Sequence, residues 1–182
     1  GLGHITRSGV LMLCAAWELY IEEVLLEGVD YFTHQLDSPK GLPKPVQKEI
    51  ARSVKEAKHD LKPLELAGEG WKDLYRNHVT DCIKGLNTPK STNLDPLFKK
   101  FIGVNEVSSW WSLGKKTIND FVTSRGDIAH KGRDAHYVTI IKLKEYRRQV
   151  KKTALDVDNE LTEYLCQATP GVERPWRRRL EN

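Results

Sequence analysis

Methionine and cysteine are scarce in this chain, and long apolar runs are missing. Met12 is the only methionine, so we expect the sequence to be one domain of a longer protein or to follow a removed tag. The first residues, GLGHITRSG, lack the charged and then apolar segments of a signal peptide. No stretch approaches the roughly 18 apolar residues of a membrane-spanning helix. These absences predict a cytoplasmic protein without a membrane partner.

The three cysteines, Cys14, Cys82 and Cys166, are odd in number and far apart in the sequence. That spacing argues against a disulfide framework, and no CxxC pair or Cys/His cluster indicates a zinc site. We therefore expect reduced, packed cysteines and a protein that needs neither a metal nor another cofactor.

Several enzyme motifs are also missing. The sequence contains no GxxxxGK[ST] phosphate loop and no GxGxxG turn after a strand, which argues against the common nucleotide-binding folds. It contains neither a GxSxG nucleophile turn nor an HExxH zinc motif. The net charge of +4 permits an anionic partner but does not identify one.

Helical periodicity dominates what is present. Apolar residues recur every three or four positions over 5–35, from Pro45 onward, over 71–86, from about 113 to 122 and over 143–164. We expect a short further helix over 96–101, capped by Asp95. Strand-like alternation is confined to 136–141, where no partner strand is apparent. The pattern predicts an all-α fold, an up-and-down bundle of about four or five long helices with short extra helices.

The charge is unevenly placed at the C-terminal end, ERPWRRRLEN. We expect a helical domain over 1–170 and a mobile basic tail over 171–182. Arg177 and Arg178 follow Trp176, and arginine beside an aromatic ring suits phosphate contact and base stacking. The alternative is an ordinary solvated tail.

The segment SRGDIAHKG, residues 124–132, holds two side chains of complementary chemistry. His130 can transfer a proton near neutral pH, and Arg125 offers a permanently charged, planar fork to a phosphate. On a regular helix the two would lie about 140° and about 7.5 Å apart. Either a helix start at Ser124 and Asp127 breaks the helix, or two copies of the segment meet across a two-fold axis. Taken alone, the pair could also be two ordinary polar residues of a helix.

The wider context favours a functional pair. RGDIAHKG resembles the signature of the HEPN superfamily, an Arg followed after four to six residues by a His, and is nearest to its RiboL-PSP type. NLDPLFKKFIGV resembles that group's stretch before the motif, and AAWELYIEEVL resembles its first helix. The resemblance extends over about residues 10–167.

That resemblance implies an activity. Many HEPN proteins are metal-independent endoribonucleases of toxin–antitoxin or anti-phage systems, and they are often homodimers with a shared active-site cleft. By resemblance Arg125 and His130 are the catalytic residues, with Asp127 and Glu18 supporting the motif, although Glu18 can instead be an ordinary solvated or structural residue of the first helix. The family often has Asn after the Arg, where this chain has Gly126. The expected partners are an RNA substrate, a second copy of the chain, and an antitoxin or regulatory protein.

Basic residues that follow the motif are further candidates for contact with RNA. Lys131, Arg133 and His136 can form part of a surface for the RNA backbone, or can be ordinary exposed charge. The alternative to an enzyme is a non-catalytic HEPN module that binds RNA or a protein partner within a larger chain. An adaptor without a nucleic-acid role is a third reading.

Overall fold

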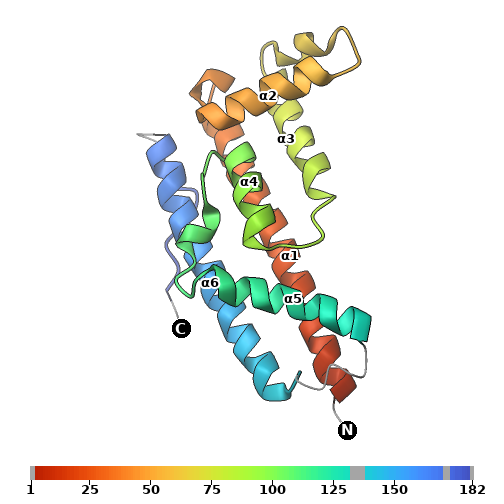
Figure 1. The fold of residues 1–182 in the computed structure, drawn as a ribbon. Helices are drawn as coiled ribbons and strands as arrows, with labels where there is room; N and C mark the ends of the chain where they lie inside the picture. Colours follow the sequence, from red (N-terminus) through yellow and green to blue (C-terminus); the bar gives the residue numbers. More distant parts are fainter. Residues whose placement is uncertain (1–2, 132–137, 170–172, 181–182) are drawn as a thin grey trace.

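Two long helices form the frame of the protein. The computed structural model describes residues 3–131, 138–169 and 173–180. In it α1 (Gly3–Gln35) runs beside α6 (Ile140–Ala168), with α3 (Gly70–Ile83) and α5 (Lys115–Lys131) packed against α1 (Figure 1). These ranges contain six α-helices and three 3₁₀ helices and no strand, so the all-α prediction is confirmed. No helix in the described ranges is long and apolar enough to cross a membrane.

The core follows the apolar stripe of α1. Val10, Cys14, Trp17, Ile21 and Phe32 are all completely buried, at the three- and four-residue spacing that the sequence shows. Around them pack the large side chains of the later helices, including Trp71, Tyr75, Phe98, Phe101 and Phe121. Burial of this continuous stripe holds α1 at the centre of the bundle.

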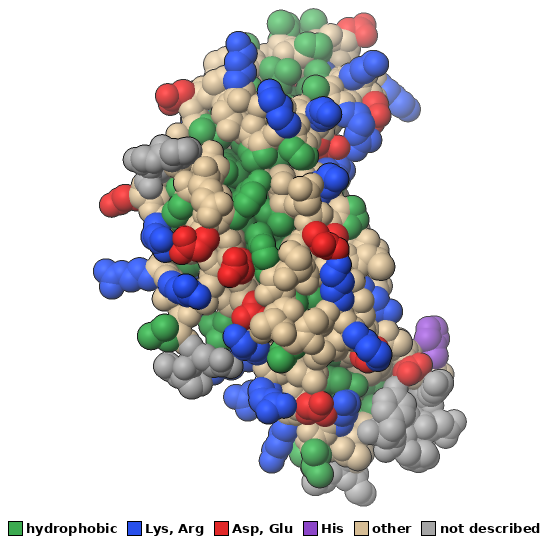
Figure 2. All heavy atoms as spheres, turned by 60° about the vertical axis from the view of Figure 1, so that its left-hand side comes forward, with side chains coloured by type: hydrophobic (Ala, Val, Ile, Leu, Met, Phe, Trp, Pro, Cys, Tyr) green, Lys and Arg blue, Asp and Glu red, His purple; other side chains and the backbone are tan. Residues whose placement is uncertain are grey.

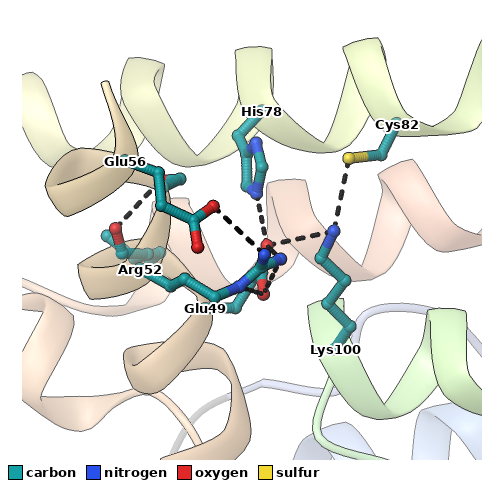
Figure 3. Close-up of polar contacts among 8 residues, drawn as sticks. Glu49, Arg52, Glu56, His78, Cys82 and Lys100 are labelled. Atoms are coloured by element: carbon teal, nitrogen blue, oxygen red, sulfur yellow. Dashed lines mark hydrogen bonds and ion pairs between the residues drawn. The ribbon is translucent and has the colours of Figure 1, made fainter. Parts of the chain in front are cut away.

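A charged cluster joins the helices at the other end of the molecule from the motif. Glu49 of α2 (Lys44–Glu56) is 7% exposed and accepts hydrogen bonds from Arg52 and from His78 of α3 (Figure 3). Lys100 of α4 (Ser91–Phe101) lies 3.0 Å from the same carboxylate. Burial acts to raise the pKa of Glu49, but the hydrogen bonds from these three partners outweigh it and lower that pKa. Glu49 therefore stays ionised at the junction of three helices.

The predicted start of α4 was wrong. The helix begins at Ser91 rather than Pro96, and Asp95 lies inside it instead of capping it. Asp95 accepts hydrogen bonds from the backbone N–H and the hydroxyl of Ser108, at 2.8 and 2.6 Å, and so ties η3 (Val107–Trp110) to α4. Pro96 removes only one helical hydrogen bond, to the carbonyl of the exposed Thr92.

A helix break at Ser124, one of the two arrangements considered for the motif, is also absent. α5 is one α-helix through the described part of the motif, and the buried Ser124 hydroxyl donates to the carbonyl of Phe121, 2.6 Å away. The strand-like alternation over 136–141 lies partly outside the described residues, and Ile140 and Ile141 belong to the start of α6. The hydroxyl of Thr139 caps that start by accepting from Lys142 N.

The basic C-terminal segment packs on α6 over residues 173–180, so the expectation of a mobile tail was wrong for this part. The indole N–H of Trp176 donates to the carbonyl of Asp158 at 3.1 Å. Arg174 forms a two-bond ion pair with Glu163, and Arg179 lies 3.1 Å from the carboxylate of Asp158. Paired charges and one large aromatic side chain hold the segment in place. The remaining short helices are η1 (Pro39–Gly41) and η2 (Lys62–Leu66).

Candidate functional site

Arg125 and His130 line one pocket of about 480 Å³ on the surface of α5. The other α5 residues in its wall are Val122, Thr123, Gly126, Asp127 and Ala129. Thr88 and Lys90, from the connection between α3 and α4, also line it. The pocket therefore has two walls, one from α5 and one from a segment far from it in the sequence.

Arg125 and His130 line the same pocket from one straight helix, with Gly126 between them. On α5, Gly126 is about 100° around the axis from Arg125, within the arc of about 140° that separates Arg125 from His130. A Cβ atom built on Gly126 would meet no atom within 4 Å. The missing side chain leaves open space into which the longer side chains on both sides can reach.

The Arg125 side chain is anchored at one nitrogen. Its Nη1 donates to the backbone carbonyl of Asn87 at 2.5 Å and lies 3.9 Å from Oε2 of Glu18 on α1. Nε and Nη2 make no hydrogen bond to any residue in the described ranges. A guanidinium has five N–H donors, so this anchor leaves donors for a ligand. His130 is exposed on the same wall and has no hydrogen bond to the described residues.

Cys14 is a buried residue of α1 whose thiol is influenced by the charges of Arg125 and Glu18. Burial raises the pKa of its thiol to about 11, the positive charge of Arg125 opposes the rise and Glu18 adds to it. A neutral, packed thiol is therefore expected beneath the site at physiological pH. All three cysteines are without a disulfide.

Of the residues predicted to support the motif or to contact RNA, not all line the pocket. Asp127 lines the pocket, and Glu18 contacts Arg125 without lining it. Lys131 is the last residue of α5, while Arg133 and His136 lie outside the described residues.

Arg177 and Arg178 are exposed on the C-terminal segment, which the structure does not bring to the pocket. Asp158, to which this segment is bound, accepts a hydrogen bond from Tyr20. Tyr20 and Glu18 are two residues apart on α1 and so lie about 200° apart around its axis. The segment and the motif thus lie on different sides of α1, as Figure 1 also shows.

Sequence reasoning missed the second wall of the pocket and one basic face. Thr88 and Lys90 belong to a turn-rich stretch whose sequence gives no sign of contact with α5. Lys144, Arg147 and Arg148 are exposed along α6, without a hydrogen bond or ion pair to a described residue. Figure 2 shows lysine and arginine side chains over the lower part of this side of the molecule, at the level of the first half of α6. Such a face attracts anions over a distance but carries no site by itself.

Comparison with known families identifies the family of the chain. In the described ranges, no group of three or more His, Cys, Asp or Glu side chains is arranged to hold a metal ion. Searches among curated proteins and solved structures gave no match. The family model RiboL-PSP-HEPN matches residues 2–163, which includes the Arg125–His130 pair and every α-helix up to most of α6. The chain therefore belongs to the RiboL-PSP-type HEPN family, as the resemblance of its motif indicates.

Proposed function

We propose that this protein is a metal-independent endoribonuclease in which Arg125 and His130 cleave RNA. The observation that carries the proposal is the shared pocket: two residues of complementary chemistry, five positions apart on one helix, line the same cavity. The side chain of Arg125 retains unused donors, and that of His130 is exposed. Phosphodiester cleavage needs a fixed cation and a group that moves protons, both within reach of one phosphate.

The reaction follows from the chemistry of RNA. The 2′-oxygen attacks the adjacent phosphorus, and the bond from phosphorus to the 5′-oxygen breaks. One imidazole takes the proton of the 2′-hydroxyl, and a protonated imidazole gives a proton to the departing 5′-oxygen. Arg125 stabilises the negative charge on the pentacoordinate phosphorus. The products carry a 2′,3′-cyclic phosphate and a 5′-hydroxyl.

A second copy of the chain would supply the second imidazole. Ile5, Met12 and Leu19 are 57%, 73% and 54% exposed and lie seven residues apart, so they form one apolar stripe on α1. The exposed Ala15 and Ala16 lie along the same stripe. Exposed apolar side chains gathered in this way mark an interaction surface.

A second copy of the chain fits this stripe, because the stripe is symmetric about Met12: Ile5 lies seven residues before it and Leu19 seven residues after it. An antiparallel pair of α1 helices, related by a two-fold axis near Met12, would place Ile5 of each helix against Leu19 of the other.

The cellular role that we propose follows from the family. Such an activity suits a cytoplasmic toxin or anti-phage effector that cuts cellular or invading RNA and is held in check by an antitoxin or a regulatory partner. Asp127, Lys131, Arg133 and His136 are proposed contacts of the motif or of the RNA backbone. Arg177 and Arg178 would contact only RNA that extends around α1.

A non-catalytic RNA-binding module is the second candidate. Gly126 favours it, because the position at which the family often carries Asn has no side chain here. A pocket without that polar group can still bind a phosphate through Arg125. The two candidates differ in whether RNA is cut, so one assay separates them.

The test is cleavage of total RNA and of a defined oligonucleotide in EDTA, with the wild type beside Arg125→Ala and His130→Ala. We expect cyclic-phosphate ends from the wild type and none from either variant. Arg148→Ala, an exposed arginine of α6, is the matched control and should cleave normally. A folded wild type that binds RNA without cutting it would favour the binding module. Cleavage that survives both substitutions would refute the assignment of the site.

A further inference from the structure

Lys90 is the cation on the second wall of the pocket. It lies in the connection between α3 and α4 and lines the pocket together with Arg125 and His130. Lys90 precedes α4 as its N-cap residue, but its side chain makes no capping hydrogen bond. The side chain is therefore not needed for the helix start.

The backbone on each side of Lys90 is hydrogen-bonded to another helix, to α1 before it and to α5 after it. Immediately before Lys90, the carbonyl of Pro89 accepts a buried hydrogen bond from the indole N–H of Trp17 on α1, at 3.0 Å. Immediately after it, the backbone N–H of Ser91 donates to Asn119 of α5, and the amide of Asn119 donates to the Ser91 hydroxyl, both at 2.9 Å. Lys90 thus extends from a backbone fixed at the residues on each side, which lowers the entropy lost when its side chain binds a ligand.

The ammonium of Lys90 has no hydrogen bond or ion pair with any residue in the described ranges, although its side chain is half-buried. Other half-buried lysines are paired: Lys100 with Glu49, and Lys152 with Asp156. Lys90 and Arg125 give the pocket two cations, against the single carboxylate of Asp127 among the residues that line it. An ammonium offers three donors to oxygen acceptors, and this one has them available for a ligand.

We propose that Lys90 forms a phosphate-binding subsite that holds the RNA backbone against the wall that carries Arg125 and His130. The proposal rests on the proposed function, and it adds a residue that the motif does not contain. Lys90 binds a non-bridging oxygen of a backbone phosphate, and Thr88 lines the same wall. The RNA strand then passes between the two walls, with the 2′-hydroxyl of the bound nucleotide toward α5.

Binding of an RNA that cannot be cleaved tests the subsite independently of catalysis. The probe is a fluorescein-labelled 2′-O-methyl oligoribonucleotide, which lacks the attacking hydroxyl, and fluorescence anisotropy gives its Kd over a range of NaCl concentrations. We expect Lys90→Gln to weaken binding about tenfold at low salt. The slope of log K against log salt should fall by about 0.7, the value for one phosphate contact with a single strand. Lys90→Arg should retain most of the affinity.

The matched control is Lys99→Gln, an exposed lysine of α4 that does not line the pocket. It removes the same charge from the other end of α4, so an equal effect of both glutamine variants would refute the subsite and indicate general attraction to positive charge. Unchanged affinity and slope in Lys90→Gln would also refute it, even if the wild type cleaves RNA. If Lys90→Gln alone weakens binding while the wild type cleaves nothing, the subsite stands and the nuclease proposal fails. Thermal melts of each variant check that the fold is intact.

Discussion

The guanidinium of Arg125 donates a hydrogen bond to the backbone carbonyl of Asn87, and this contact joins the motif helix to the connection between α3 and α4. Asn87 is three residues before Lys90, so the same connection both anchors one cation and carries the other. The anchor limits the positions that the Arg125 side chain can take. A site arranged before the ligand arrives is what electrostatic catalysis requires.

Arg125→Lys keeps the charge of this residue but loses its planar fork. A lysine at this position cannot hold Asn87 and a phosphate in fixed geometry at once, so we expect kcat for RNA cleavage to fall about 100-fold. Loss of the anchoring hydrogen bond should cost about 1 kcal/mol of unfolding free energy. Single-turnover kinetics and urea unfolding measure the two effects. Arg148→Lys is the control, and a cleavage rate equal to wild type in Arg125→Lys would contradict the role of the fork.

Gly126 should accept a side chain, because a Cβ atom there meets nothing within 4 Å. Gly126→Ala lies inside a regular helix and is expected to raise the unfolding free energy by about 0.5–1 kcal/mol. Gly126→Asn introduces the residue that the family often has, and we expect cleavage at least as fast as that of the wild type. Thermal melts and the cleavage assay measure these outcomes.

Gly114, directly before α5, is the contrasting glycine. Its φ of +79° is one that residues with a Cβ rarely adopt, so Gly114→Ala should lower stability although space is available. A loss of cleavage in a stable Gly126→Asn variant would show instead that the pocket needs the open space at this position.

The apolar stripe on α1 predicts the oligomeric state. Met12→Glu places a charge at the proposed two-fold axis, so two carboxylates would face each other in the dimer and the chain should become monomeric. Sedimentation velocity measures the mass, and we expect cleavage to fall with dimerisation while the circular dichroism spectrum stays unchanged. Leu64→Glu, at another exposed apolar residue, should leave a dimer intact. A wild type that is monomeric at micromolar concentration would contradict the shared cleft.

Glu49 is predicted to determine stability in acid. Its pKa is lowered in the folded protein, so its contribution is complete above about pH 4.5 and is lost as the pH falls through the lower folded pKa. Glu49→Gln leaves Arg52, His78 and Lys100 without their common carboxylate, and should lower the unfolding free energy by about 3 kcal/mol at pH 7.

Urea unfolding at pH 7 and at pH 3.5 tests this prediction. The difference in stability between wild type and Glu49→Gln should shrink at the lower pH, because Glu49 is then protonated in the unfolded chain and its lowered pKa in the folded protein contributes less. Glu56→Gln removes an exposed partner of Arg52 and should change stability by less than about 0.5 kcal/mol. A constant difference at both pH values would show that shape, and not charge, is what Glu49 contributes.

Sequence periodicity was sufficient to predict the helices, but not the residues at which each helix begins or ends. The stripe of α1 and the spacing in α6 each predict a helix that the structure contains, since burial of one face requires that periodicity. The start of α4 was missed because Ser91 is bound by Asn119, a residue of another helix. The helix does not break at Ser124, whose hydroxyl bonds within its own helix.

The sequence by itself determined the all-α class and the family, and marked Arg125 and His130 as a candidate pair, because periodicity and a short motif are local properties of a chain. Only the tertiary structure decided that the pair lines one pocket, that Asn87 anchors Arg125, and that Lys90 belongs to the opposite wall. These contacts join residues far apart in the sequence. They exist because the side chains of Trp17 and Asn119 hold the connection between α3 and α4 in place, and no local pattern encodes that packing.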